Sequence, residues 1–324
     1  MKKIASRLAC CSLALGLAWT AGPARAEYPE KPVRLVVPYT PAGGTDVLAR
    51  LLAERLTQDL GQTFVVENRA GADGMIGTGF VAQSPADGYT LALVSSSHAV
   101  NPTLNKNISF DTMKDLRCIT QTAVQQIILV SHPDLPVRSV AELIDYGKKH
   151  PEALYFASSS KASQLPMELF AAMAGMKMTN VPYKGSGPAL TDMIAGRVQT
   201  GFIAAASAMP FIESAKLRAL AIGDDSRSSL MPDLPTVAEA AGIPGFSAEP
   251  WNGVLAPAGL PADVTQRLNA AINRAMSAPQ AREVLRKLGQ FPLTGSPRDF
   301  ADHIRSQTER WAEVIETSHI PKAD

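Results

Sequence analysis

Short β-branched runs alternate along this chain with amphipathic helical patterns, and that alternation limits the possible folds more than any other feature. In the clearest helical pattern, residues 46–60, the aliphatic side chains fall on one face. Apolar strands that alternate with such helices predict an α/β fold whose mostly parallel sheets carry helices on both faces. The strand-like runs are 33–37, 64–67, 89–94, 127–130, 154–157, 198–203, 217–222 and 253–255; further helical patterns are 140–150, 165–174, 187–195, 262–276 and 297–317.

The length of the chain predicts two lobes. Its 324 residues are 46% hydrophobic, which supplies material for two cores. The polar–apolar alternation at 119–126 is suited to cross between lobes, and 248–251 is suited to cross back. We therefore predict one lobe from residues 27–126 plus 249–324 and a second lobe from residues 127–248.

The N-terminus has the pattern of a cleavable secretory signal. Basic residues precede an apolar run at 8–19, and Ala24-Arg25-Ala26 supplies the small-x-small pattern of a cleavage site. The run is shorter than the roughly 20 residues that a membrane-spanning helix needs. We predict that residues 1–26 are removed and that the protein is periplasmic.

Loss of that segment would remove basic residues and no acids, so the formal charge would fall from +1 to −3; the residues are Lys2, Lys3, Arg7 and Arg25. A mildly acidic chain lacks the positive field that nucleic acid binding requires, so no nucleic acid partner is expected. Cys118 would be the one remaining cysteine and is expected to be buried. The histidines show no metal-ligand spacing, and no metal is expected; they are His98, His132, His150, His303 and His319.

The most informative segment, residues 37–46, joins the first predicted strand to the first helix and reads Val-Pro-Tyr-Thr-Pro-Ala-Gly-Gly-Thr-Asp. Its Gly-Gly turn lets a ligand approach the main chain closely. The helix start adds free N–H groups and about half a positive charge, which suits a carboxylate or phosphate. The alternative is a plain strand-to-helix turn with Thr45 or Asp46 as the N-cap.

A second candidate loop, residues 157–163, reads Ala-Ser-Ser-Ser-Lys-Ala-Ser and again lies between a strand and a helix. Its hydroxyl and N–H groups are suited to hold a second carboxylate from the opposite lobe. As an alternative, Ser158 and Lys161 fit the Ser-x-x-Lys pattern of penicillin-binding enzymes, with Ser158 as nucleophile. Neither a Ser-Asp-Asn nor a Lys-Thr-Gly partner motif occurs in the chain, so a hydrolase is the less favoured hypothesis.

Five groups of segments together carry a resemblance to a known family, and they run in order through residues 28–320. They are 28–34 with 37–46, 66–72, 85–91, 181–190 with 195–196, and 217–221 through 234–236 and Trp251 to 256–259. In these segments the chain resembles the Bug, or TctC-like, family of periplasmic solute-binding receptors of tripartite tricarboxylate transporters.

The resemblance implies a two-lobed, type II-like flytrap that closes around one small organic carboxylate. It implies no cofactor and no catalysis, a monomer, and membrane transporter subunits as partners; a sensor that presents its ligand to a signalling receptor would share the same fold and site. Lys161 and Gln164 depart from the family's usual residues, so the ligand stays open. The expected ligand-binding residues are Tyr39, Thr40, Ala42, Gly43, Gly44, Thr45, Asp46, Ser95, Ser96, Ser158, Ser159, Ser160, Lys161, Ser163, Tyr183, Ala204 and Ala205.

Overall fold

The structure, a computed structural model, describes residues 28–105, 107–158, 161–228 and 231–317. The predicted secretory signal, residues 1–26, lies outside the described residues. Within the described ranges, every helix is too short or too polar to cross a membrane.

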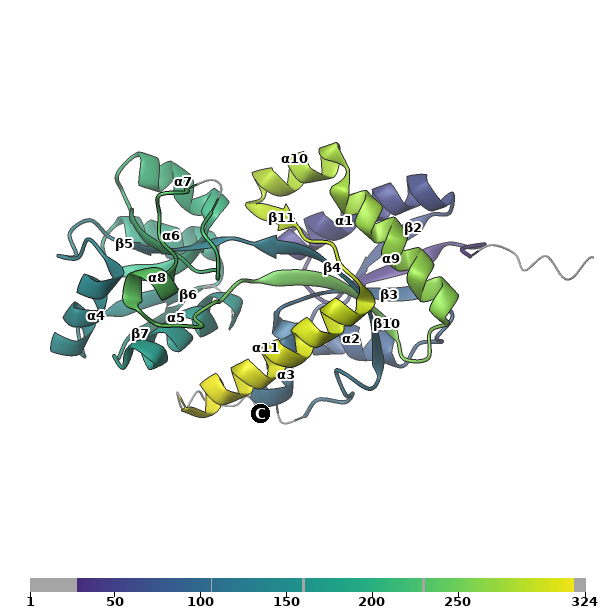
Figure 1. Cartoon of the computed structure of the whole chain (residues 1–324), viewed down its shortest axis with the longest axis horizontal. Coiled ribbons are helices and arrows are strands. Elements are labelled where there is room, and N and C mark those ends of the chain that lie inside the picture. The colour runs from purple at the N-terminus through teal and green to yellow at the C-terminus, as the bar shows by residue number, and fades with distance from the viewer. Residues whose placement is uncertain (1–27, 106, 159–160, 229–230, 318–324) are drawn as a thin grey trace, which may run out of the picture.

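The strands form two sheets that lie side by side along the long axis of the molecule (Figure 1). The lobe 1 sheet has the order β11-β4-β10-β3-β1-β2, and the lobe 2 sheet has the order β7-β6-β8-β5-β9. The strands of lobe 1 are β1 (Val33–Val37), β2 (Phe64–Asn68), β3 (Thr90–Ser95), β4 (Leu116–Gln125), β10 (Trp251–Pro257) and β11 (Gln290–Pro292). Those of lobe 2 are β5 (Ile127–Ser131), β6 (Tyr155–Ser158), β7 (Thr179–Pro182), β8 (Thr200–Ala204) and β9 (Arg218–Ile222).

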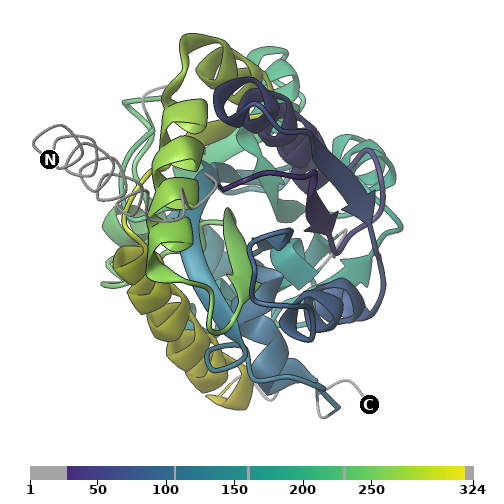
Figure 2. The same cartoon turned by 90° about the vertical axis from the view of Figure 1, so that its right-hand side faces the viewer.

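Helices cover both faces of the lobe 1 sheet, as the view from that end of the molecule shows (Figure 2). Successive strand residues point to opposite faces, so Leu35 packs in one cluster and Val36 in the other. The first cluster contains side chains of α1 (Gly44–Leu60), α9 (Ala262–Ser277) and α10 (Pro279–Lys287). The second contains side chains of α2 (Met75–Ala82), α3 (Ser97–Leu104) and α11 (Pro297–Thr317).

The lobe 2 sheet is covered in the same way. One of its faces packs against α6 (Ser186–Ile194) and α7 (Ala205–Glu213). The other packs against α4 (Val140–Lys149), α5 (Lys161–Ala174) and α8 (Val237–Ala241). The cluster on this last face of the lobe 2 sheet also contains Val100 and Leu104 of α3 and Trp311, Val314 and Ile315 of α11. Two helices that begin on lobe 1 therefore contribute to the core of lobe 2.

The chain crosses between the lobes twice. It leaves lobe 1 from β4 into β5 and returns at β10, which pairs with β4 in antiparallel register. The two crossings are bonded to each other, because the Gln125 amide donates to the Pro250 carbonyl at 2.7 Å. The predicted boundaries near residues 126 and 249 lie at these crossings, and the exact division into lobes stays a prediction.

The sheets are mixed, and the prediction of mostly parallel sheets was wrong. In lobe 1, β1 pairs in parallel with β2 and β3, whereas β10 is antiparallel to β3 and to β4. In lobe 2, β6 is parallel to β7 and β8, whereas β5 is antiparallel to β8 and β9. The reason in lobe 1 is connectivity. The chain leaves this lobe along β4 and returns along β10, and because these two strands lie side by side they must run in opposite directions.

Two carboxyl groups lie close to these crossings. Asp224 follows β9 and is 4% exposed, and its Oδ2 accepts a 3.4 Å hydrogen bond from Nε2 of Gln126. Burial raises the pKa of the Asp224 carboxyl to about 7. Burial, with the nearby charges of Asp224 and Asp225, raises the pKa of Glu249 to about 8. The folded chain therefore binds these protons more tightly than the unfolded chain does.

Stability is expected to fall as pH rises from about 4 to about 8 and to level off above that, because between these limits the folded state holds these protons and the unfolded state has already lost them. Thermal unfolding between pH 5 and pH 9 measures this. Asp224→Asn should flatten the decline and raise the midpoint at pH 9. Asp134→Asn is the matched control, because that carboxyl is 93% exposed. An equal slope in Asp224→Asn and the wild type would contradict the assignment.

Candidate functional site

No side chain caps the first turn of α1. Gly43 is the N-cap in an extended conformation, and no side chain accepts a hydrogen bond from the turn. Residues 40–44 are exposed. The N–H groups at the start of a helix need acceptors, so this turn presents donors and a positive helix end to the solvent. The predicted N-cap, Thr45 or Asp46, is wrong, because both residues lie inside α1; that the loop binds a ligand stays a prediction.

Asp46 fixes the shape of this loop. Its carboxylate accepts hydrogen bonds from the Ala42 amide at 2.9 Å, Arg50 at 3.0 and 3.1 Å, and Asn68 at 2.9 Å. Asn68 also donates to the Tyr39 carbonyl at 3.2 Å. Burial raises the pKa of the Asp46 carboxyl, but the hydrogen bonds outweigh this and hold it below its ordinary value. The carboxylate stays ionised, and it holds Ala42 at a φ of 65°, which a residue with a side chain rarely adopts.

Three further hydrogen bonds tie the loop to the sheet. The Tyr39 hydroxyl accepts hydrogen bonds from the amide and the hydroxyl of Ser95, at 3.0 and 2.7 Å. Asn252 of β10 donates to Thr45 Oγ1 at 3.0 Å. The side chains of Tyr39, Thr45 and Asp46 thus hold the loop, which leaves its main chain as the part that faces outward.

A cavity of about 210 Å³ lies on the lobe 2 side of the crossings. It is lined by the first residue of α6, by early residues of α5 and α7, and by both crossings; the residues are Gln125, Ile127, Ala157, Ser163, Ser186, Ala189, Phe202, Ile203, Ala204, Ser207 and Pro250. Neither α6 nor α7 has a side-chain cap at its start. Helix starts that meet at one cavity favour an anion there.

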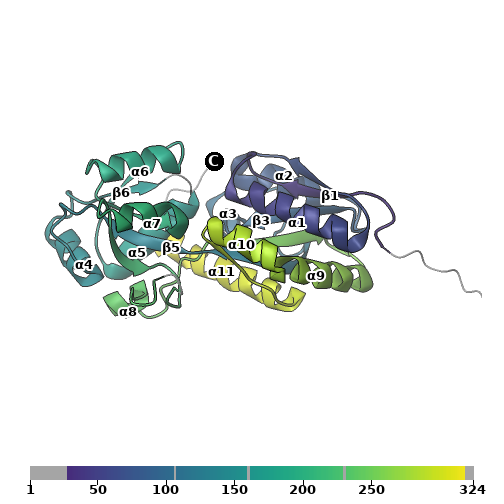
Figure 3. The same ribbon diagram turned by 90° about the horizontal axis from the view of Figure 1, so that it is seen from above.

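A short chain of contacts connects the α1 loop with this cavity. If residue 44 carried a side chain, its Cβ would lie 3.4 Å from Nε2 of Gln290, so the Gln290 side chain ends beside the start of α1. Gln290 is paired in the sheet with Gln125, which lines the cavity. A Cβ built on Gly289 would lie 2.9 Å from the amide nitrogen of Ala206 at the start of α7. Figure 3 shows α10 and α7 facing each other at this junction.

The structure brings part of the predicted site together. Ser163 and Ala204 line the cavity. Residues 39–46 and Ser95 lie in lobe 1, outside that lining, and their place in the site stays a prediction. Ser96 begins the turn into α3, and its amide donates to the Trp251 carbonyl. Ala205 is buried at the start of α7, where its amide donates to the Gln126 carbonyl at 2.9 Å.

Other predicted residues are engaged elsewhere or lie outside the description. The Ser158 hydroxyl donates to Asn180 at 2.7 Å, which does not suit a nucleophile awaiting a base. The Tyr183 hydroxyl donates to Asp192 at 2.9 Å, away from the cavity lining. Ser159 and Ser160 lie outside the described residues, and Lys161 is described only as the first residue of α5.

Sequence reasoning missed several site residues. Ser186 follows Gly185 at a helix start, which repeats the glycine-then-helix pattern of the α1 loop and could have been found by that signal. Gln125 and Gln290 carry no sequence signal, because they are ordinary polar residues in strands.

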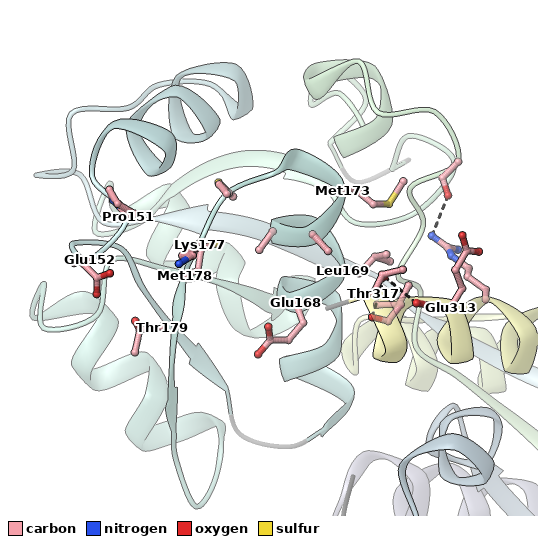
Figure 4. Close-up of a pocket in the computed structure, with 16 residues that line it drawn as sticks. Pro151, Glu152, Glu168, Leu169, Met173, Lys177, Met178, Thr179, Glu313 and Thr317 are labelled. Carbon is pink, nitrogen blue, oxygen red and sulfur yellow. Dashed lines mark hydrogen bonds between the residues drawn. The ribbon is translucent and has the colours of Figure 1, made fainter. Parts of the chain in front are cut away.

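A larger hollow of about 680 Å³ lies away from this cavity, between α5 and the last turns of α11 (Figure 4). Its charged side chains are mixed in sign: Glu152, Glu168, Lys177, Arg310 and Glu313. The C-terminal end of α11 also contributes negative potential. These features do not favour an anion. Among the described residues, no cluster of three histidine, cysteine or carboxylate side chains could hold a metal.

Asp46→Asn should loosen the α1 loop, because an amide cannot accept all of these bonds as a carboxylate does. The free energy of unfolding should fall by about 1–3 kcal/mol. Urea denaturation measures this. Asp59→Asn is a matched control in the same helix: its partner Arg274 is 60% exposed, so a loss of at most about 1 kcal/mol is expected. Equal losses in the two variants would show that Asp46 makes only a surface contact.

Comparisons with known proteins agree with this geometry. A family model described as "Tripartite tricarboxylate transporter family receptor" matches residues 48–320. Protein BugT of Bordetella pertussis is 39% identical over 313 residues, covering 95% of this chain and 96% of that protein.

Two solved structures share the fold along nearly their whole length. R. palustris Rpa4515 with adipate has a TM-score of 0.77 and 36% identity, and the match covers 91% of this chain and 99% of that chain. MatC from Rhodopseudomonas palustris with bound malate has a TM-score of 0.73 and 29% identity, and covers 89% and 100%. The predicted two-lobed binding-protein fold is confirmed. The family is one of receptors and not of enzymes, and this chain belongs to it: it is a member of the TctC, or Bug, family of solute-binding receptors.

Proposed function

We propose that this protein is a periplasmic receptor that binds a small organic carboxylate between its two lobes and delivers it to a tripartite tricarboxylate-type transporter. The observations that carry the proposal are three uncapped helix starts. The starts of α6 and α7 line one cavity of lobe 2, and α1 of lobe 1 begins beside Gln290, whose strand partner Gln125 lines that cavity. Each start offers main-chain donors and a positive helix end to an anion. The adipate and malate in the two Rhodopseudomonas proteins support a carboxylate ligand.

The mechanism we propose is closure by population shift. A carboxylate that contacts α1 on one side and α6 or α7 on the other has more contacts when the lobes are close together. The ligand then favours the closed form by its difference in affinity for the two forms. Membrane transporter subunits would read the closed form, and the receptor would act as a monomer.

Ligand binding is expected to raise the unfolding midpoint, because a free ligand concentration of about 100 times the Kd stabilises the folded state by about 2.7 kcal/mol. A thermal-shift screen of mono-, di- and tricarboxylates, including adipate and malate, checks this. The matching amides serve as uncharged controls. No shift with any acid, or equal shifts with acids and amides, would argue against a carboxylate receptor.

Gly44→Val should weaken carboxylate binding about 100-fold or more, because the side chain would cover the first-turn amides that make charge-assisted hydrogen bonds. Gly44→Ala should have a smaller effect, since its Cβ would meet only Nε2 of Gln290 at an ordinary contact distance. Isothermal titration with the best acid of the screen gives both values. An unchanged unfolding midpoint without ligand shows that each variant folds, and full affinity in a folded Gly44→Val protein would exclude this loop from the site.

A further inference from the structure

Gln290 is a buried polar side chain with an unmet hydrogen-bonding capacity. It begins β11, is 3% exposed, and its Oε1 has no hydrogen-bond partner among the described residues. Buried amide groups are nearly always paired, because an unpaired one lowers the stability of the fold. This orphaned acceptor shows only that the protein's own hydrogen bonds leave Oε1 unpaired. Oε1 would stay unpaired beside an anion, and Nε2 is the atom of this side chain that can donate to one.

The amide nitrogen of Gln290 faces the start of α1. The distance from Nε2 to a Cβ built on Gly44 is 3.4 Å, so the side chain ends next to the first turn of the helix. That turn has no side-chain cap. Nε2 and the first-turn N–H groups are all donors and cannot satisfy one another. An acceptor between them would satisfy both sides, and a carboxylate, with several lone pairs on two oxygens, suits this position.

The same segment touches lobe 2. Gly289 has a φ of 65°, and a Cβ on it would lie 2.9 Å from the backbone nitrogen and the Cβ of Ala206, in the first turn of α7. Residues 289 and 290 therefore lie between the helix start of one lobe and the helix start of the other. A ligand that joins the two lobes would pass over this pair of residues.

We propose that Gln290 is a specificity-determining residue, whose Nε2 donates a hydrogen bond to the ligand carboxylate held by the first-turn amides of α1. The inference rests on the proposed function and adds to it. Hydrogen bonds to an ionised acceptor are roughly twice as strong as those to a neutral one. Gln290 therefore helps the site to choose an ionised carboxylate over the corresponding amide or ester.

The test compares Gln290→Leu and Gln290→Glu with the wild type by isothermal titration with adipate and with malate at pH 7.5. The loss of a donor in Gln290→Leu should weaken binding about 10-fold or more. Gln290→Glu should weaken it further, because a carboxylate beside α1 repels the anion and competes for the same amides. Leu293→Ala, a 40% exposed residue just after β11, is the matched control and should bind as the wild type does.

The order of the two variants separates recognition from packing. Glutamate matches the shape of glutamine better than leucine does, so a purely structural role predicts the larger loss in Gln290→Leu. That order overturns the inference, as do unchanged affinities in both variants. Tighter binding by Gln290→Leu also overturns it, because it would show that the amide is turned so that Oε1 caps α1. In these three cases the proposed function stands. A wild type that binds neither acid moves the same comparison to the best acid of the screen, and a wild type that binds no acid of the screen contradicts the proposed function itself.

Discussion

The structure depends on main-chain N–H groups at the starts of α1, α6 and α7, which no side chain among the described residues caps. Helix starts normally carry a serine, threonine, aspartate or asparagine cap, and this chain uses such caps where they only stabilise: Ser139 caps α4 and Thr236 caps α8. At the junction between the lobes, the positions before α1, α6 and α7 are Gly43, Gly185 and Ala204, which cannot supply one. The starts of α2, α3, α9 and α10 lack a side-chain cap as well. What suits the junction to an external acceptor is therefore that two uncapped starts, those of α6 and α7, line one cavity there.

The α1 loop shows how a site can be rigid although its binding groups are main chain. Asp46, which is buried, forms a hydrogen-bonded network beneath the loop with the exposed Arg50 and the half-buried Asn68, and none of them needs to touch the ligand. Because the carboxylate of Asp46 is neutralised by Arg50, its charge does not oppose an anion a short distance away. Polar side chains here shape the backbone, and the backbone presents the donors.

Much of this could be predicted from the sequence. β1 and α11 lie at the predicted residues, because β-branched runs and a regular apolar stripe are strong local signals. The helices α2 and α3 were missed, since glycines weaken the pattern of the first and Pro102 lies inside the second. The place of Gln290 could not be foreseen either: β11 is three residues long, and its importance comes from pairing with β4, far away in the sequence. Local patterns reveal elements, whereas a site built between lobes depends on long-range pairing.

The C-terminal helix has a consequence for how the lobes can move. α11 begins on the lobe 1 sheet, and Trp311, Val314 and Ile315 near its end are buried in the core of lobe 2. Pulling the lobes straight apart would expose these side chains to water, at about 1.5–3 kcal/mol for each one. A swing that pivots at the end of α11 keeps them covered. The helix acts as a tether that permits rotation and resists translation, so the two halves of the binding site would return to the same alignment each time they meet.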